Sequence, residues 1–487
     1  MAVSAEPHTL RNFIGGSWVE ATGTTSLGDR DPATGDLAAF VPRSGAADVD
    51  AAVRAARGAQ PAWAAMSPQD RSRAVLALRE LLVEHRDDLA ALVTADMGKT
   101  LADARGEVGR GIESVEAAAA IPHLLKGETL EGVAAGVDVE MVRQPVGVVA
   151  AITPFNFPAM IPLWFLPFAL ATGNSFVLKP SERDPRPAEL IFKLLESTGA
   201  VPPGVANLVH GDRAAVEAIL DHPEVDAVSF VGQAKTARLI ATRCAETGKR
   251  AQALGGAKNA LVVMPDADLA RAVPAIMGSA FGAAGQRCLA GSVCVVVGER
   301  ERQDEVRVAL ADAARGLVAG PGTEPLTDVC PMVSPDARER AETAIQTAVD
   351  SGAELLLDGR MGGGQAGTML HPTLIETPDR ESDLAREEIF GPVLALVRAS
   401  DLDDALRFVN GSRYGNAGAI FTSSGASARS YRRRVEAGML GVNVGVPAPV
   451  AWFPFAGWKD SCDGDLHANG PDAVEFYTRK KVITSRW

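Results

Sequence analysis

The chain has 487 residues, of which 47% are hydrophobic, so it can bury the cores of two or three domains and is not broadly disordered. Its 48 basic and 61 acidic residues give a formal charge of −13, which argues against non-specific binding to nucleic acid or to anionic membranes. The N-terminus shows no signal-peptide pattern, and the longest apolar run, 159–171, is too short to span a bilayer. Five cysteines without a CxxC pair predict free thiols in the cytoplasm, and the scattered histidines predict no metal site.

The first part of the chain predicts helices followed by strands. An alanine-rich helix is expected at 44–66, and Ser67 caps a second one that continues to Gly98. A third helix is expected at 101–124, and strand-like segments follow at 137–142 and 146–152.

From residue 175 on, strands and helices alternate, which predicts a parallel α/β sheet of the doubly wound type. Strands are expected at 175–179, 206–210 and 227–231. Each is followed by a helix: the first at 187–197, the second between the strand 206–210 and residue 220, and the third at 234–247. After Leu254 a second α/β unit is expected, with strands at 260–264, 293–297, 393–397 and 417–421.

A cysteine lies in a loop of small residues just before one of these buried strands. Glycine and alanine residues lead into Gln286, Arg287 and Cys288, and the apolar strand at 293–297 follows. Such a loop leaves room for a substrate carbon to reach the sulfur, and the charge of Arg287 is expected to favour the nucleophilic thiolate. An ordinary buried cysteine would show the same local pattern.

Five motifs along the chain together resemble those of the aldehyde dehydrogenase superfamily. They are TPFNFP at 153–158, VLKPSE at 177–182, FVG at 230–232, GQRC at 285–288 and EEIFGP at 387–392. The resemblance extends from the FIGG sequence at 13–16 to the C-terminal tail, so it covers nearly the whole chain.

This resemblance implies an aldehyde dehydrogenase-like α/β fold with a Rossmann-type NAD domain, an α/β catalytic domain and a small β element for oligomerisation. It places the NAD-binding domain at 1–124 and 143–253, the catalytic domain at 254–448, and the oligomerisation strands at 125–142 and 466–487. It also implies a small-molecule aldehyde as substrate, and a homodimer or homotetramer in which these strands pair between subunits.

The NAD pyrophosphate is expected where the strand 227–231 meets the following helix. Gly232 turns the chain there, and the helix would present its free N–H groups to a phosphate. By resemblance this turn binds the pyrophosphate of NAD. Gln233 stands where the family usually has serine or threonine, so the contact is expected from the backbone.

The adenosine and nicotinamide ends of NAD are expected at two further motifs. Lys179 and Glu182 follow a strand, and a carboxylate there can bind the ribose 2′-hydroxyl and repel a 2′-phosphate, which favours NAD over NADP. A solvated Lys–Glu pair is the alternative. By resemblance, Glu388 and Phe390 hold the nicotinamide ribose and ring.

The TPFNFP motif supplies Asn156, whose amide can donate a hydrogen bond from a rigid, proline-bracketed loop. By resemblance, this amide and the N–H of Cys288 stabilise the oxyanion formed when a thiolate adds to an aldehyde. Thr153 and Phe155 of the same motif are expected at the cofactor. An asparagine that only forms a turn is the alternative.

One position lacks the residue that hydrolytic members of the family carry. Those enzymes have ELGGK before the nucleophile, and its glutamate activates the water that cleaves the thioester. The chain reads ALGGAKN at 253–259, which puts Leu254, at the edge of the cofactor site, in the place of that base. Sliding the alignment by one residue puts Ala253 there, which also cannot take a proton. GAKN is similar to the CoA-acylating methylmalonate-semialdehyde dehydrogenases. A CoA thiol, with a pKa of about 8.5, is partly ionised at neutral pH and needs a base less than water does.

The same branch binds a substrate carboxylate with two arginines, and Arg110 and Arg287 match those positions. Guanidinium groups bind carboxylates bidentately, so the resemblance implies a small carboxylated semialdehyde of the malonate or methylmalonate type. A solvated helix face is the alternative for Arg110. Cys462, in the tail, departs from the family's usual aromatic pattern.

The sequence thus predicts a CoA-acylating, NAD-dependent oxidation of such a semialdehyde. Two other functions stay open: a hydrolytic enzyme whose water is activated by another group, and a non-catalytic homologue that kept the fold. Intact Cys288 and Asn156 argue against the second.

Overall fold

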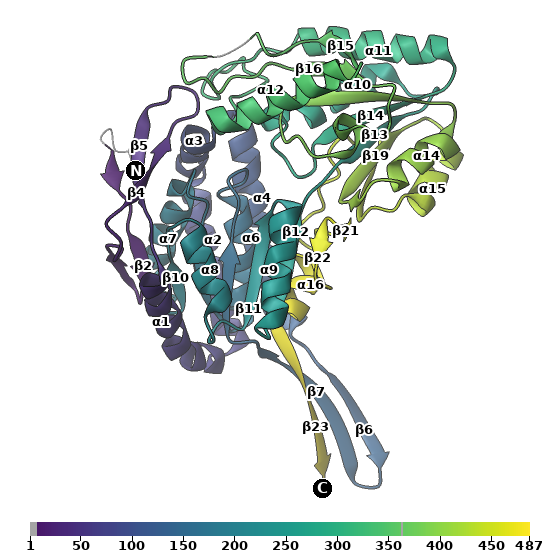
Figure 1. Cartoon of the computed structure of the whole chain (residues 1–487). Helices are drawn as coiled ribbons and strands as arrows, with labels where there is room; N and C mark the ends of the chain where they lie inside the picture. Colours follow the sequence, from purple (N-terminus) through teal and green to yellow (C-terminus); the bar gives the residue numbers. More distant parts are fainter. Residues whose placement is uncertain (1–6, 362–363) are drawn as a thin grey trace.

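The computed structural model describes residues 7–361 and 364–487, and an eight-stranded sheet organises its N-terminal half (Figure 1). The central strands run parallel, whereas the strands at both edges pair antiparallel. In order across the sheet, the strands are β22 (Cys462–Asp463), β12 (Arg250–Gly255), β11 (Ala227–Gly232), β8 (Val148–Ile152), β9 (Ser175–Lys179), β10 (Ala206–Leu208), β2 (Asn12–Ile14) and β3 (Ser17–Val19).

Helices cover both faces of this sheet because alternate residues of its strands point to opposite sides. The even-numbered residues of β8 pack with one group of helices, namely α1 (Ala46–Ala65), α8 (Arg213–Asp221) and α9 (Ala234–Glu246). The odd-numbered residues pack with the other group, namely α2 (Pro68–Glu84), α3 (Arg86–Met97), α4 (Leu101–Ala119), α6 (Met160–Ala171) and α7 (Arg186–Ser197). The apolar run that forms α6 is buried along its whole length in this layer. Among the described residues, no helix is long and apolar enough to cross a membrane.

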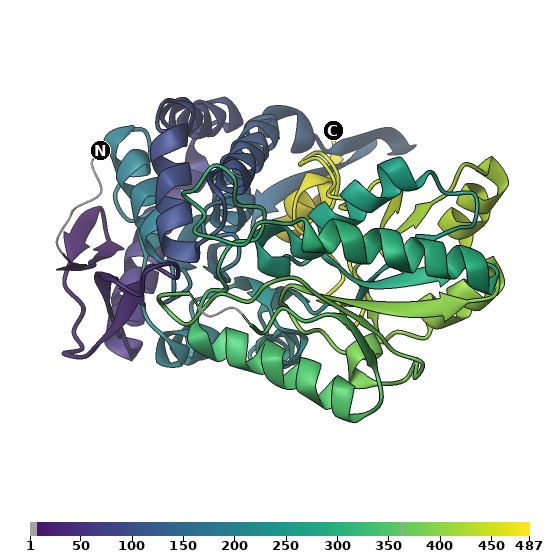
Figure 2. The ribbon, with the colours of Figure 1, turned by 90° about the horizontal axis from the view of Figure 1, so that it is seen from above.

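A seven-stranded sheet organises the C-terminal half, which lies beside the first (Figure 2). All neighbours pair parallel except β15 and β16. In order, its strands are β15 (Glu354–Leu357), β16 (Thr373–Glu376), β17 (Val393–Ala399), β14 (Gly291–Val297), β13 (Asn259–Val263), β19 (Ala417–Phe421) and β20 (Met439–Val442). The flanking helices are α10 (Leu269–Phe281), α11 (Arg300–Arg315), α12 (Pro335–Asp350), α13 (Asp383–Arg386), α14 (Leu402–Asn410) and α15 (Gly425–Arg434). The predicted doubly wound, parallel α/β organisation is confirmed.

A three-stranded antiparallel arm projects from the body, and the C-terminus lies at its tip (Figure 1). Its strands are β6 (Glu128–Ala134), β7 (Val137–Pro145) and β23 (Thr478–Arg486). Every residue of β6 is exposed, and apolar side chains at Leu130, Val482 and Trp487 face solvent. The division into domains stays a prediction, and 1–6 and 362–363 of the predicted domains lie outside the described residues.

Short elements complete the chain. They are a small sheet of β1 (His8–Thr9), β5 (Leu37–Pro42) and β4 (Ser26–Arg30), the pair β18 (Tyr414–Gly415) and β21 (Trp458–Lys459), and helices α5 (Ile121–Leu124) and α16 (Gly470–Phe476).

Two of the expected helices are each divided in two. Ser67 caps α2 by accepting a bond from the Asp70 N–H, and Gly98 ends α3 in the left-handed region, as predicted. Between them, however, the helix breaks at His85, and the third helix breaks at Ala120. Apolar spacing continued across both breaks, so the sequence pattern did not reveal them.

Candidate active site

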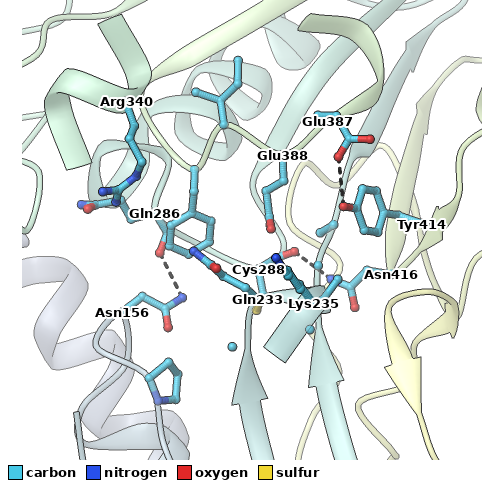
Figure 3. A pocket seen from close by; sticks show the side chains of 18 of the residues that line it. Asn156, Gln233, Lys235, Gln286, Cys288, Arg340, Glu387, Glu388, Tyr414 and Asn416 are labelled. Atoms are coloured by element: carbon cyan, nitrogen blue, oxygen red, sulfur yellow. Dashed lines mark hydrogen bonds between the residues drawn. The ribbon is translucent and has the colours of Figure 1, made fainter. Parts of the chain in front are cut away.

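A cavity of about 1160 Å³ lies where the carboxyl ends of the strands in the first sheet face the second half of the chain. It receives side chains from many separate segments, which meet only in the folded chain (Figure 3). Eleven of the residues predicted from the sequence line it: Cys288, Asn156, Thr153, Phe155, Lys179, Glu182, Gly232, Gln233, Leu254, Glu388 and Phe390.

Cys288 is held in place through its backbone. Its carbonyl accepts hydrogen bonds from the side-chain amides of Asn259 (2.8 Å) and Asn416 (2.7 Å), and Figure 3 shows the second of these bonds. The loop before it packs closely on the EEIFGP motif, since a Cβ on Gly285 would lie 2.2 Å from the carbonyl oxygen of Gly391. The position of the cysteine is therefore fixed by contacts with three distant parts of the chain.

The Cys288 side chain is half-buried, and its surroundings favour the neutral thiol. Burial raises its pKa to about 12, and the nearby Glu388 carboxylate acts in the same direction, outweighing the backbone amides and Arg287. Arg287 makes an ion pair with Asp103 (2.7 Å), and the carboxylate offsets the positive charge of the guanidinium group. Arg287 lowers the pKa of the Cys288 thiol, as expected, but burial and Glu388 outweigh this effect.

The Asn156 side chain is buried beside the cysteine loop. Its amide donates a 3.0 Å hydrogen bond to the carbonyl of Gln286, two residues before Cys288 (Figure 3). The Gln286 side chain is fixed in turn, because it accepts a bond from the Val333 N–H (3.0 Å). An N–H donor thus lies beside the loop that carries Cys288, with the Gln286 carbonyl as its partner in this structure.

The turn expected to bind the pyrophosphate opens into the cavity. β11 ends at Gly232, where a Cβ would come within 2.4 Å of the Phe230 ring, so only glycine fits. Gln233 is the N-cap of α9, and its side chain makes no capping bond. The first amides of α9 therefore have no side-chain cap and can meet an anion.

The pair expected at the adenosine ribose is formed. Lys179 and Glu182 make a 2.7 Å ion pair, with the lysine buried and the glutamate partly exposed. Burial alone would raise the pKa of Glu182, but the charge and hydrogen bond of Lys179 outweigh it and lower that pKa. Glu182 is thus an ionised acceptor at the edge of the cavity.

The opposite wall is formed by the EEIFGP motif. Burial raises the pKa of Glu388 to about 7, although Lys258 opposes this shift. Phe390 has a left-handed backbone (φ 57°) and packs edge-to-face against Phe155, with ring centroids 5.9 Å apart. Positive φ is uncommon outside glycine, so the surrounding structure holds Phe390 in that conformation at the cavity wall.

Leu254 lies in β12 and is almost fully buried in the floor of the cavity. It pairs with Val231 of β11 on one side and Cys462 of β22 on the other. An alkyl side chain therefore occupies the position aligned with the hydrolytic base.

Arg110 and Arg287 lie outside this cavity. Arg110, on α4, donates to Glu113 (2.7 Å) and to the carbonyl of Pro449. Asp103, the partner of Arg287, precedes Arg110 by two helical turns, so both guanidinium groups lie along α4. The structure thus brings the two arginines to one helix, each next to a carboxylate.

Several site residues were missed from the sequence. Asn416, Tyr414, Lys99 and Glu107 lie outside the motifs of the sequence, whereas Asn259 lies within ALGGAKN and Gln286 within GQRC. The Tyr414 hydroxyl donates to Glu387 at 3.3 Å (Figure 3). Burial raises the pKa of Tyr414 to about 12, so it remains a neutral donor.

Comparison with known proteins agrees with this geometry. Residues 18–483 match the model of the aldehyde dehydrogenase family. The chain is 49% identical to malonate-semialdehyde dehydrogenase 1 of Geobacillus kaustophilus (strain HTA426), over 99% of this chain and 98% of that one. It superimposes, at 43% identity, on a structure from Sinorhizobium meliloti 1021 named as a methylmalonate-semialdehyde dehydrogenase and complexed with NAD (TM-score 0.97, 99% of each chain). The methylmalonate-semialdehyde dehydrogenase of Oceanimonas doudoroffii is similarly close (TM-score 0.96, 43% identity, 99% and 98% of the two chains). With matches over its full length and the cysteine, asparagine and glutamate of the motifs meeting in one cavity, the chain belongs to the aldehyde dehydrogenase family.

Proposed function

We propose that this protein oxidises a small carboxylated semialdehyde, of the malonate or methylmalonate type, with NAD and transfers the acyl group to coenzyme A. The relatives named above support the substrate class. The observation that carries the choice of acyl acceptor is Leu254, an alkyl side chain in the cavity of the nucleophile where hydrolytic enzymes place a base.

The residues of the cavity fit NAD. The open N-terminus of α9 suits a pyrophosphate, and the Lys179–Glu182 pair suits a ribose. The Thr153 hydroxyl is buried at the cavity and has no hydrogen-bond partner among residues 7–361 and 364–487, so a donor or acceptor of the cofactor could satisfy it. Glu388 and Phe390 would hold the nicotinamide end.

The residues of the cavity suit the first step. The Cys288 thiol passes its proton to a base of the cavity, for which the nearby Glu388 carboxylate is the candidate, and the sulfur adds to the aldehyde carbon while the Asn156 amide with the Cys288 N–H stabilises the oxyanion. NAD, when bound, accepts the hydride from the resulting carbon. This leaves an acyl thioester on Cys288, which the CoA thiolate attacks to release acyl-CoA and free the cysteine. With malonate or methylmalonate semialdehyde, loss of CO₂ would give acetyl-CoA or propanoyl-CoA.

The acyl acceptor can be tested with Leu254. Without CoA, NADH formation by the wild type should show a burst of about one equivalent per site and then a slow rate, because nothing activates water at that position. Adding CoA should accelerate the steady rate and yield acyl-CoA. Leu254→Glu should raise CoA-independent hydrolysis by up to roughly 10²–10⁴-fold, the range for a well-placed general base.

Leu254→Gln is the matched control, since it adds a side chain of the same size without a basic group. Both variants are followed by NADH absorbance and by chromatography of acid and acyl-CoA products. Fast wild-type turnover to free acid without CoA would refute the acylating assignment.

A hydrolytic function is the second candidate, and Glu388 is the observation that favours it. Its carboxyl has a pKa of about 7 and lies close enough to raise the pKa of the Cys288 thiol, so it could serve as a base for water. Because Glu388 is also proposed to hold the nicotinamide end, the test follows only the step after hydride transfer, on the acyl-enzyme. If Glu388 activates water, Glu388→Gln should slow release of free acid from the acyl-enzyme; if CoA is the acceptor, release of acyl-CoA should be unchanged.

Arg110 is proposed to bind the substrate carboxylate together with Arg287. Arg110→Leu should weaken kcat/KM for a carboxylated semialdehyde by about 2 kcal/mol, the low end for truncating one partner of a charge pair, because its side chain is about one-third exposed. Propanal, which has no carboxylate, should be used nearly as well as by the wild type. Steady-state kinetics with the two aldehydes measures the difference.

Arg105→Leu is the control for helix α4. Arg105 lies on the same helix and pairs with Asp87 at 2.8 Å on the surface. The Arg105→Leu variant should have the same kcat/KM as the wild type with both aldehydes. Equal losses on both aldehydes in Arg110→Leu would mean that Arg110 supports the fold and not the substrate.

We also propose a homodimer or homotetramer formed through the arm of β6, β7 and β23, whose exposed apolar side chains support such pairing. Light scattering measures the mass. The domain boundaries given above and a cytoplasmic location are further proposals; the second is supported by five cysteines that are all free.

A further inference from the structure

A buried lysine lies beneath the loop that carries Asn156. The Lys99 side chain is only 1% exposed, and its ammonium donates to the Asn156 carbonyl (2.6 Å) and to the Glu107 carboxylate (2.6 Å). It also lies 4.1 Å from the centre of the Phe157 ring, a cation–π contact. One cation thus contacts two consecutive residues, Asn156 and Phe157, of the loop formed by the TPFNFP motif.

Glu107 holds the other side of the same loop. One of its oxygens binds Lys99, and the other accepts the N–H groups of Ala159 (2.8 Å) and Met160 (3.1 Å) at the start of α6. Those amides have no partner within α6, so the carboxylate replaces the missing cap. Lys99 and Glu107 together form hydrogen bonds to the backbone on both sides of Pro158.

Stability alone does not explain why the charged pair Lys99–Glu107 is buried. Removing two charges from water carries a large desolvation penalty, and a buried ion pair is often no more stabilising than apolar residues of the same size. Such a pair instead fixes the local geometry, because every buried charged atom must keep its hydrogen bonds to particular partners. Here those partners are the backbone groups of the loop that places the Asn156 amide 3.0 Å from the Gln286 carbonyl.

We infer that Lys99 and Glu107 are positioning residues for aldehyde oxidation: from α4 and its N-terminal flank they fix the loop so that the Asn156 amide meets the oxyanion on Cys288. The inference rests on the oxyanion role proposed for Asn156 and holds whichever acyl acceptor follows. Neither residue is within the cavity itself, so they act through Asn156 and do not touch the substrate.

The test is a double-mutant cycle with Lys99→Met/Glu107→Gln and Asn156→Ala. The Lys99/Glu107 variant should slow single-turnover NADH formation by roughly 10–100-fold, the cost of a small displacement of a catalytic group. The KM for NAD should stay within about twofold of wild type, because none of the cofactor contacts is changed. In the Asn156→Ala background the same pair of changes should cost less than about threefold, since the amide they position is gone.

Rates are normalised to the concentration of NAD-binding sites, measured by fluorescence titration, so that unfolded protein is not counted. Arg57→Met is the control: it breaks the Arg57–Asp226 ion pair (2.7 Å) far from the loop and should act equally in both backgrounds. If the double variant does not fold, Glu107→Gln alone replaces it, because glutamine keeps an oxygen for the two amides and replaces the oxygen that accepts from Lys99 with an NH2 group.

If the Lys99/Glu107 changes slowed the reaction by the same factor in the wild type and in Asn156→Ala, the inference would be overturned and the proposed function left intact. A wild type that oxidises no aldehyde would instead refute the proposed function, and the inference with it. The two failures are therefore distinguishable from a single set of rates.

Discussion

Replacing Cys288 by alanine is expected to abolish NADH production from every aldehyde while leaving NAD affinity close to that of the wild type. The covalent step needs the sulfur, and nothing else in the proposed mechanism can form the hemithioacetal from which hydride leaves. The side chain removed is small and half-buried, and the cofactor contacts come from other residues of the cavity. NADH absorbance measures the loss, and fluorescence titration measures NAD binding.

Cys294→Ala is the matched control for this result. Cys294 lies six residues further on, in the core strand β14, and burial raises its thiol pKa to about 12, as for Cys288. It does not line the cavity, so its removal should leave turnover unchanged. Residual activity of Cys288→Ala within about tenfold of the wild type would exclude Cys288 as the nucleophile.

Asn156→Ala is expected to lower kcat by roughly 10²–10³-fold, the usual loss when one oxyanion donor is removed. The amide is needed in the transition state, where negative charge develops, much more than in the ground state, so the KM for aldehyde should change little. Stopped-flow measurement of the NADH burst reports the step directly.

Asn207→Ala separates this effect from loss of structure. Asn207 is a fully buried asparagine of β10 whose side chain is hydrogen-bonded to backbone groups, such as the Gly15 N–H at 2.9 Å. It should lower the melting temperature and leave kcat per active site unchanged. If Asn156→Ala raised KM alone, Asn156 would be a structural residue and another donor would have to stabilise the oxyanion.

Local sequence determined much of the secondary structure. The Ser67 cap and the Gly98 stop are where the pattern placed them, because each acts through its own backbone and immediate neighbours. The alternation of apolar strands and amphipathic helices predicted the parallel sheets for the same reason. The break at His85 was not predictable, since apolar spacing continued through it.

The chain's motifs also identified which residues share a site, although these residues are spread over more than two hundred positions of the sequence. Asn156, Leu254, Cys288 and Glu388 all line one cavity. Each follows or belongs to a strand end or turn with a recognisable sequence, so the family resemblance could place them without coordinates.

Only the tertiary structure decided the electrostatics of that site. Arg287 adjoins Cys288 in the sequence, yet its side chain pairs with Asp103 of α4, while burial and Glu388 raise the thiol pKa to about 12. In the same way, Lys99 became a partner of Asn156 only through folding. A pKa and an ion pair depend on how much water is removed and which charges face each other, and in this chain those groups come from segments far apart in the sequence that meet only in the folded chain.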